Sequence, residues 1–126
     1  MKHSVRHFSV KEFNCPCCGR VKVAVALVFW LDVFRRALGH PLRVNSGFRC
    51  ASRNAGVGGS STSRHLIGCA ADLSIPEGVE RDAFFQMARR LSGEGWEIKE
   101  YPTFLHIAVP REKQIKVWDG GEVVTL

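Results

Sequence analysis

Two histidines and one aspartate are the residues of this chain best suited to hold a metal ion: His65, Asp72 and His106. Each lies in or beside an apolar segment typical of a strand, so a folded sheet could fix their positions. Catalytic zinc usually has three protein ligands and an open fourth position, whereas structural zinc has four ligands, often cysteines. The His-Asp-His set therefore predicts a catalytic site for one zinc ion.

A zinc ion in such a site lowers the pKa of its water and polarises a carbonyl group, as amide hydrolysis requires. Each ligand has a simpler interpretation when it is taken alone. His106 could be a hydrogen-bonded core histidine, the commoner role for a histidine among apolar residues. Asp72 lies between Ala71 and Leu73 in a segment predicted to be buried, where an unpaired carboxylate costs several kcal/mol. A bound metal ion removes that cost.

The elements expected around these residues are helices and strands in alternation. Residues 22–38 are apolar enough for a mostly buried helix, which ends at Gly39 because Pro41 cannot continue it. Residues 54–63 are rich in glycine, serine and threonine and predict a loop. A second helix is predicted over 79–91, and strands over 42–46, 69–75, 96–99, 104–109, 113–118 and 122–125.

The length of 126 residues fits one domain covering the whole chain. No apolar run reaches the roughly 18 residues of a membrane span, and the polar start lacks the apolar stretch of a secretory signal. The net charge of +6 could attract nucleic acid or an anionic bacterial envelope. Because the basic residues are scattered rather than arranged in a stripe, we expect no nucleic-acid binding.

The ten residues 63–72, with the pattern S-x-H-x-x-G-x-A-x-D, resemble the signature of the zinc D-alanyl-D-alanine carboxypeptidase and L-alanyl-D-glutamate peptidase family. Vancomycin-resistance D,D-dipeptidases and the hedgehog domain are related to that family. The resemblance extends to residues 45–49 and 54–59 upstream and to 101–102 and 104–106 downstream, and it covers roughly residues 8–110. Gly68 and Ala70 are small, as expected where the chain passes close to a metal and packs into a sheet.

The resemblance implies roles for five residues. His65, Asp72 and His106 would bind the zinc ion, Arg49 would stabilise the carbonyl or carboxylate of the substrate, and Ser63 would hydrogen-bond the bound peptide. A guanidinium suits this task because it offers a fork to a carboxylate and charge to a developing oxyanion. A surface ion pair is the simpler alternative for Arg49.

The general base departs from the family pattern. Related enzymes commonly carry an acid or a histidine three residues before the last zinc ligand, where this chain has Thr103, which cannot accept a proton at neutral pH. We predict that Glu100, which shares strand parity with His106, is the catalytic base, with Glu97 as the next candidate. Residues 107–108 also lack an aspartate that could orient a metal ligand.

The five cysteines allow more than one interpretation. Cys15 and Cys18 have C-x-x-C spacing with Cys17 between them, which supplies half of a tetrahedral zinc site. Cys50 could be a third ligand, but the sequence shows no fourth. The resemblance implies a structural lid instead, for which a disulfide to Cys50 is one option. Cys69, in a predicted core strand, is expected to behave as a small hydrophobic residue.

We therefore expect an α+β fold, with a small antiparallel sheet, helices packed on one side and the zinc site in a cleft on the sheet. The predicted function is that of a zinc metallopeptidase that hydrolyses peptidoglycan, as a D-Ala-D-Ala carboxypeptidase or an endolysin-like endopeptidase. The alternative is a non-catalytic zinc-containing module that binds cell-wall peptide, which Thr103 permits. We expect a monomer that is made in the cytoplasm and acts on the cell wall like a phage or prophage lysin.

Overall fold

The computed structural model describes residues 10–60, 62–111, 114–119 and 122–126. Its helices are η1 (Val10–Phe13), α1 (Val25–Leu38), α2 (Ala51–Gly56), η2 (Arg64–Ile67) and α3 (Arg81–Leu91), where η marks a 3₁₀ helix. Its strands are β1 (Lys22–Ala24), β2 (Val44–Ser46), β3 (Ala70–Ser74), β4 (Glu97–Glu100), β5 (Phe104–Ala108), β6 (Lys116–Asp119) and β7 (Glu122–Thr125). None of the helices in these ranges is both long and apolar enough to cross a membrane.

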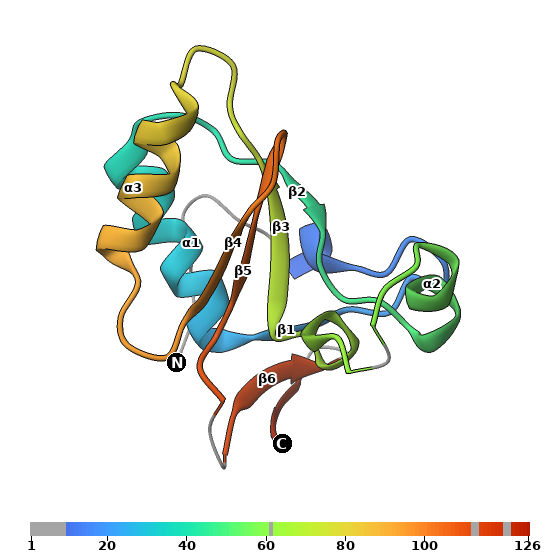
Figure 1. The fold of residues 1–126 in the computed structure, drawn as a ribbon. Helices are drawn as coiled ribbons and strands as arrows, with labels where there is room; N and C mark the ends of the chain where they lie inside the picture. Colours follow the sequence, from blue (N-terminus) through green and yellow to red (C-terminus); the bar gives the residue numbers. More distant parts are fainter. Residues whose placement is uncertain (1–9, 61, 112–113, 120–121) are drawn as a thin grey trace.

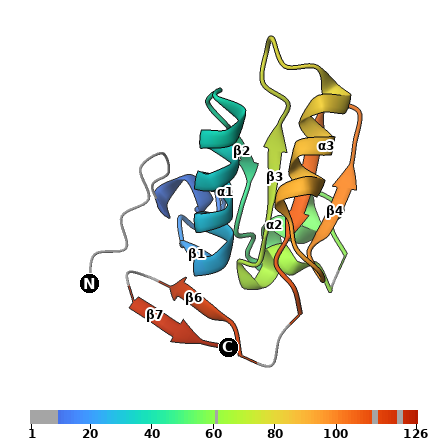
Figure 2. The same ribbon diagram turned by 90° about the vertical axis from the view of Figure 1, so that its left-hand side faces the viewer.

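The strands form two antiparallel sheets. One has four strands in the order β2-β3-β5-β4, and the other has three in the order β1-β6-β7. Helices α1 and α3 cover one face of the four-stranded sheet, whereas α2 and η2 lie on its other side (Figures 1 and 2). The predicted α+β class with an antiparallel sheet is confirmed, and the two long helices pack on one side as expected. The short helices α2 and η2 on the other side and the second sheet were not anticipated.

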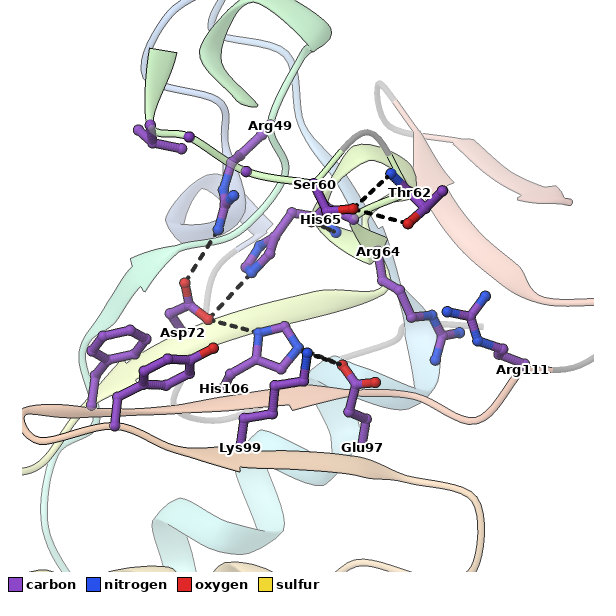
Figure 3. Close-up of a pocket in the computed structure, with 16 residues that line it drawn as sticks. Arg49, Ser60, Thr62, Arg64, His65, Asp72, Glu97, Lys99, His106 and Arg111 are labelled. Carbon is purple, nitrogen blue, oxygen red and sulfur yellow. Dashed lines mark hydrogen bonds and ion pairs between the residues drawn. The ribbon is translucent and has the colours of Figure 1, made fainter. Parts of the chain in front are cut away.

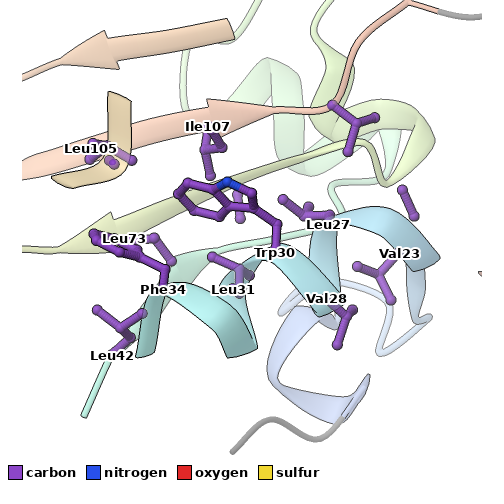
Figure 4. Packing of buried hydrophobic residues seen from close by; sticks show 14 of the residues in the cluster. Val23, Leu27, Val28, Trp30, Leu31, Phe34, Leu42, Leu73, Leu105 and Ile107 are labelled. Atoms are coloured by element: carbon purple, nitrogen blue, oxygen red, sulfur yellow. The ribbon is translucent and has the colours of Figure 1, made fainter. Parts of the chain in front are cut away.

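The core lies between the helices and the four-stranded sheet (Figure 4). Leu27, Leu31 and Phe34 recur along one face of α1 at helical spacing and are fully buried. Phe34 meets Phe84 of α3 with ring centroids 5.1 Å apart, which joins the two helices. Full burial of such a side chain contributes about 1.5–3 kcal/mol. The sheet contributes Leu73, Leu105 and Ile107 to the same cluster.

Two predicted elements differ from the structure. The predicted helix 22–38 begins at Val25, because residues 22–24 form β1, which pairs with the distant strand β6. The predicted loop 54–63 begins inside α2. Residues 61 and 113, which belong to predicted segments, lie outside the described ranges. The predicted end of α1 is confirmed: Gly39 has a left-handed φ of 73°, and its N–H bonds to the last turn.

The register of the four-stranded sheet decides which side chains share a face. Asp72 of β3 lies opposite His106 of β5, which lies opposite Lys99 of β4. The next row pairs Leu105 with Glu100 and therefore faces the helices. This register pairs Glu100 with Leu105, five positions along the chain, so an even-numbered residue of β4 shares its face with odd-numbered residues of β5. Glu100 and His106 consequently project from opposite faces of the sheet.

Candidate metal centre

Three side chains converge on one point above the sheet, on the face opposite the helices (Figure 3). His65 Nε2 lies 3.2 Å and His106 Nδ1 2.9 Å from the same oxygen, Asp72 Oδ1. His65 is buried, and the side chains of Asp72 and His106 are each 12% exposed. The cluster is thus reachable from solvent on one side.

The partner of the outer nitrogen of each imidazole shows which tautomer is present. The tautomer in turn decides whether the inner nitrogen presents a proton or a lone pair to the cluster. His65 Nδ1 lies 2.7 Å from the carbonyl oxygen of Gly47, which can only accept a hydrogen bond, so Nδ1 carries the proton. His106 Nε2 lies 2.9 Å from Glu97 Oε1 and donates its proton there. In neutral imidazoles, His65 Nε2 and His106 Nδ1 therefore both present lone pairs toward Asp72. Converging lone pairs repel one another, and a divalent cation among them fits the site.

Two carboxylates of the centre stay ionised. Burial by itself raises the pKa of Asp72, but its contacts with His106 and His65 outweigh burial and hold the pKa well below its ordinary value. Burial also raises the pKa of Glu97, and the hydrogen bond from His106 and the charge of Lys99 lower it overall. Both groups are therefore acceptors, as a metal ligand and a partner of a ligand must be.

Local structure between His65 and Asp72 sets how far apart the two side chains lie. Ser63 caps η2, since its Oγ accepts a hydrogen bond from the His65 N–H at 3.2 Å. Gly68 ends η2 with a left-handed φ of 75°. A Cβ there would lie 2.6 Å from the carbonyl carbon of Lys22, so the close approach that requires glycine is to β1 rather than to the metal.

Arg49 reaches the cluster from the segment between β2 and α2. Its guanidinium donates to Ser46 Oγ and Asn54 Oδ1, both at 3.1 Å, and to Asp72 Oδ2 at 3.3 Å. Asn54 is itself buried and also donates to the Ser60 carbonyl. The surface ion pair considered for Arg49 does not describe this geometry, because the side chain is 12% exposed. The guanidinium is fixed beside the metal centre.

A cavity of about 530 Å³ opens over the metal centre. Sequence reasoning did not identify Arg64, Lys99 and Arg111 as parts of its wall. Arg64 lies within the signature, and its guanidinium donates to the carbonyls of Val109 and Pro110. No local pattern marks the other two, because only the sheet register and the course of the chain after β5 bring them here.

The structure does not bring Glu100 to the cavity. Its carboxylate accepts two hydrogen bonds from Arg89 of α3, at 3.0 and 2.6 Å, on the helical face of the sheet. Thr103 is exposed in the turn between β4 and β5. The parity on which the choice of Glu100 rested is wrong, because the intervening turn reverses it. Glu97, the second candidate, lines the cavity.

Comparison with known proteins agrees with this geometry. Residues 6–108 match the family described as Peptidase M15. The zinc D-Ala-D-Ala carboxypeptidase of Streptomyces albus G is 38% identical over an 85-residue alignment, which covers 62% of this chain and 32% of that enzyme. The chain thus spans about a third of the length of this relative. The resemblance first seen in residues 63–72 extends over most of the sequence, and the chain belongs to the Peptidase M15 family.

Proposed function

We propose that this protein is a zinc-dependent peptidase that cleaves a peptide bond in bacterial peptidoglycan. The observation that carries the proposal is the convergence of His65 Nε2, Asp72 Oδ1 and His106 Nδ1 in an open cavity. Zinc at such a site supplies a Lewis acid that polarises a carbonyl and activates water. Family membership and the name of the Streptomyces relative support both the metal and the reaction.

Arg49 is placed to bind the substrate beside these ligands. Its contacts with Ser46 and Asn54 hold the guanidinium in one orientation, so little side-chain entropy is lost when a substrate binds. A fixed cation at this position stabilises negative charge as it develops on a carbonyl oxygen. Ser63 lines the same cavity and is proposed to hydrogen-bond the peptide.

Glu97 takes the proton-accepting role that was predicted for Glu100. Among the described residues that line the cavity, Glu97 is the carboxylate besides Asp72. Its Oε1 accepts the His106 Nε2 proton, and its side chain lines the cavity and is 37% exposed. Geometry within reach of the reacting groups is the first requirement for a general base.

The charges of the cavity favour a substrate that carries carboxylates. Four cationic side chains face two carboxylates in its wall: Arg49, Arg64, Lys99 and Arg111 against Asp72 and Glu97. Tyr101 and Phe104 stack with ring centroids 4.4 Å apart and add an apolar surface. We propose short cell-wall peptides with free carboxylates as the substrate class, as in the name of the carboxypeptidase relative.

Digestion of purified peptidoglycan tests the proposed function. The wild-type protein with stoichiometric zinc is expected to release fragments whose masses identify the bond that is cut. His65→Ala is expected to abolish release. Loss of a terminal alanine indicates a carboxypeptidase, whereas release of larger fragments indicates an endopeptidase of the lysin type. The absence of any cleavage by the zinc-loaded wild type would contradict the proposal.

One observation favours a second candidate, a module that binds cell-wall peptide without cutting it. Glu97, the described carboxylate of the cavity besides Asp72, is already bonded to His106, and Thr103 faces solvent. Sedimentation with insoluble peptidoglycan separates the two functions. A module that only binds would be retained by the wall through zinc and Arg49 but would release no fragment.

A further inference from the structure

A second group of metal-binding side chains lies outside the cavity. Cys15, Cys18 and Cys50 each present a sulfur, and the three sulfurs lie within 4.8 Å of one another. Cys15 is buried, Cys50 is half-buried and Cys18 is exposed. All are free thiols, so the structure does not show the disulfide to Cys50 that the family resemblance allowed. Nothing in the proposed peptidase chemistry uses these residues.

The spacing of the sulfurs distinguishes a disulfide from a shared metal ion. A disulfide brings its two sulfurs to about 2.05 Å. Tetrahedral zinc with Zn–S bonds of about 2.3 Å places its sulfurs about 3.8 Å apart. The Sγ atoms of Cys15 and Cys50 are 3.6 Å apart, which is close to the spacing around a zinc ion.

The backbone holds the C-x-x-C segment in a tight turn without help from the sulfurs. The Cys15 N–H donates to the Arg20 carbonyl, and the Gly19 N–H donates to the Cys15 carbonyl, both at 2.8 Å. Gly19 has a φ of 73°, which glycine adopts without strain. Asn14 and Val21 close the turn as an antiparallel bridge. The sulfurs are therefore presented by a preformed loop.

Backbone N–H groups surround the sulfur of Cys15. The N–H of Cys50 lies 3.4 Å from it, and the N–H groups of Cys18 and Cys17 also interact with it. Backbone N–H donors of this kind stabilise negative charge on the sulfur. Metals bind the thiolate rather than the thiol, so this environment suits a ligand.

We propose that Cys15, Cys18 and Cys50 bind a second zinc ion, which has a structural role. Cys17, which is exposed in the same turn, is the candidate for the fourth sulfur that closed structural sites require. This ion is additional to the single catalytic ion expected from the sequence.

The position of Cys50 explains what a structural ion would stabilise. Cys50 follows Arg49, whose guanidinium contacts Asp72 of the metal centre. The hydrogen bond from the Phe48 N–H to the Phe13 carbonyl, at 2.9 Å, already ties this segment to η1. An ion shared with the turn at residues 14–21 adds a second link beside it. The cysteine site thereby holds the segment that presents Arg49.

Zinc content tests the proposal on protein purified with a reductant. The wild type is expected to hold two zinc ions per chain, and Cys50→Ser one. Cys69→Ala is the matched control, because it removes a thiol outside the cluster, and it is expected to keep two. His65→Ala is expected to keep the cysteine-bound ion, which separates failure of this proposal from failure of the proposed peptidase.

Cobalt substitution gives a readout that needs no cysteine variant to fold. Thiolate ligands give Co²⁺ an intense near-ultraviolet charge-transfer absorption, which imidazole and carboxylate ligands do not. We expect this absorption in the wild type and in His65→Ala. A His65→Ala protein without zinc would overturn the proposal, as would equal zinc content in Cys50→Ser and the wild type. A cobalt-loaded wild type without thiolate absorption would overturn it too.

Discussion

At the scale of single residues, partners on the far side of each imidazole decide how the metal centre works. The Gly47 carbonyl fixes the tautomer of His65, and the Glu97 carboxylate fixes that of His106. Partners of this kind orient metal ligands and raise their basicity, and their loss typically costs about 10–100-fold in metal affinity or activity. Glu97 on β4 is the carboxylate that bonds the outer nitrogen of His106 in this chain, which has no aspartate at residues 107–108.

Replacing Glu97 is therefore expected to reduce activity strongly. Glu97→Gln keeps the shape of the side chain but removes its charge and its capacity to accept a proton, so kcat should fall about 100-fold or more. Glu100→Gln is the matched control, since Glu100 bonds Arg89 on the helical face. It should change kcat by less than about threefold, because an exposed ion pair contributes little.

Steady-state kinetics on peptidoglycan fragments, with zinc content measured on the same samples, check this prediction. Loss of kcat with retained zinc indicates that Glu97 handles a proton, whereas loss of zinc indicates that it orients His106. A Glu97→Gln protein as active as the wild type, beside an inactive Glu100→Gln protein, would restore the original assignment of Glu100.

At the scale of elements, the segment from η2 to β3 sets the distance between two ligands. Gly68 ends η2 in the left-handed region, and its carbonyl accepts a hydrogen bond from the Ala24 N–H at 2.8 Å. The chain then enters β3, where Asp72 lies opposite His106. The seven-residue step from His65 to Asp72 thus contains a helical turn, a glycine cap and a strand entry.

Substitution of Gly68 is expected to destabilise the fold more than substitution of a second left-handed glycine. Gly39→Ala is the control, because Gly39 has a φ of 73° and open space around it. Both alanines cost about 1–2 kcal/mol for the left-handed backbone. Gly68→Ala adds about 1–3 kcal/mol, because its Cβ meets the backbone of Lys22.

Urea unfolding of the two variants measures this difference as free energies of unfolding. Equal losses for Gly68→Ala and Gly39→Ala would show that β1 can move away from η2 at little cost. That result would contradict the role of this contact in fixing His65 relative to Asp72.

At the scale of the whole molecule, the position of a charge affects the binding of an anionic substrate more than the net charge of +6 does. Arg111 is exposed at the cavity, whereas Arg90 is exposed on α3, on the other side of the sheet. Exposed charges more than a Debye length apart, about 8 Å at physiological salt, interact weakly. An anionic substrate in the cavity therefore interacts with Arg111 and hardly with Arg90.

Arg111→Gln and Arg90→Gln change the net charge equally and separate the two effects. Arg111→Gln is expected to raise KM about fivefold at low salt with kcat unchanged, because a contact of about 1 kcal/mol is lost equally from bound substrate and transition state. Arg90→Gln should leave KM unchanged. Kinetics at two salt concentrations measure both, and equal increases in KM would indicate attraction by net charge alone.

Much of the fold and of the candidate site was predictable because its signals are local. The helix at 79–91 and the strands at 69–75 and 104–109 agree with α3, β3 and β5 within two residues at each end, since their apolar patterns are strong. Strand β1 was missed because three residues carry no pattern of their own and pair only with a distant strand. Glu100 was predicted because it and His106 are both even-numbered and would share a face of one continuous strand. The turn between β4 and β5 separates them, and the register places them on opposite faces.

The sequence by itself determined the chemical type of this protein, because residue types and their spacing survive in the chain whatever the fold. His65, Asp72 and His106 could be predicted as metal ligands, and residues 63–72 pointed to the family. The tertiary structure alone decided which nitrogens face Asp72, which carboxylate bonds His106 and which cations line the cavity. Those choices depend on sheet register and on contacts between distant segments, which are set only when the whole core packs.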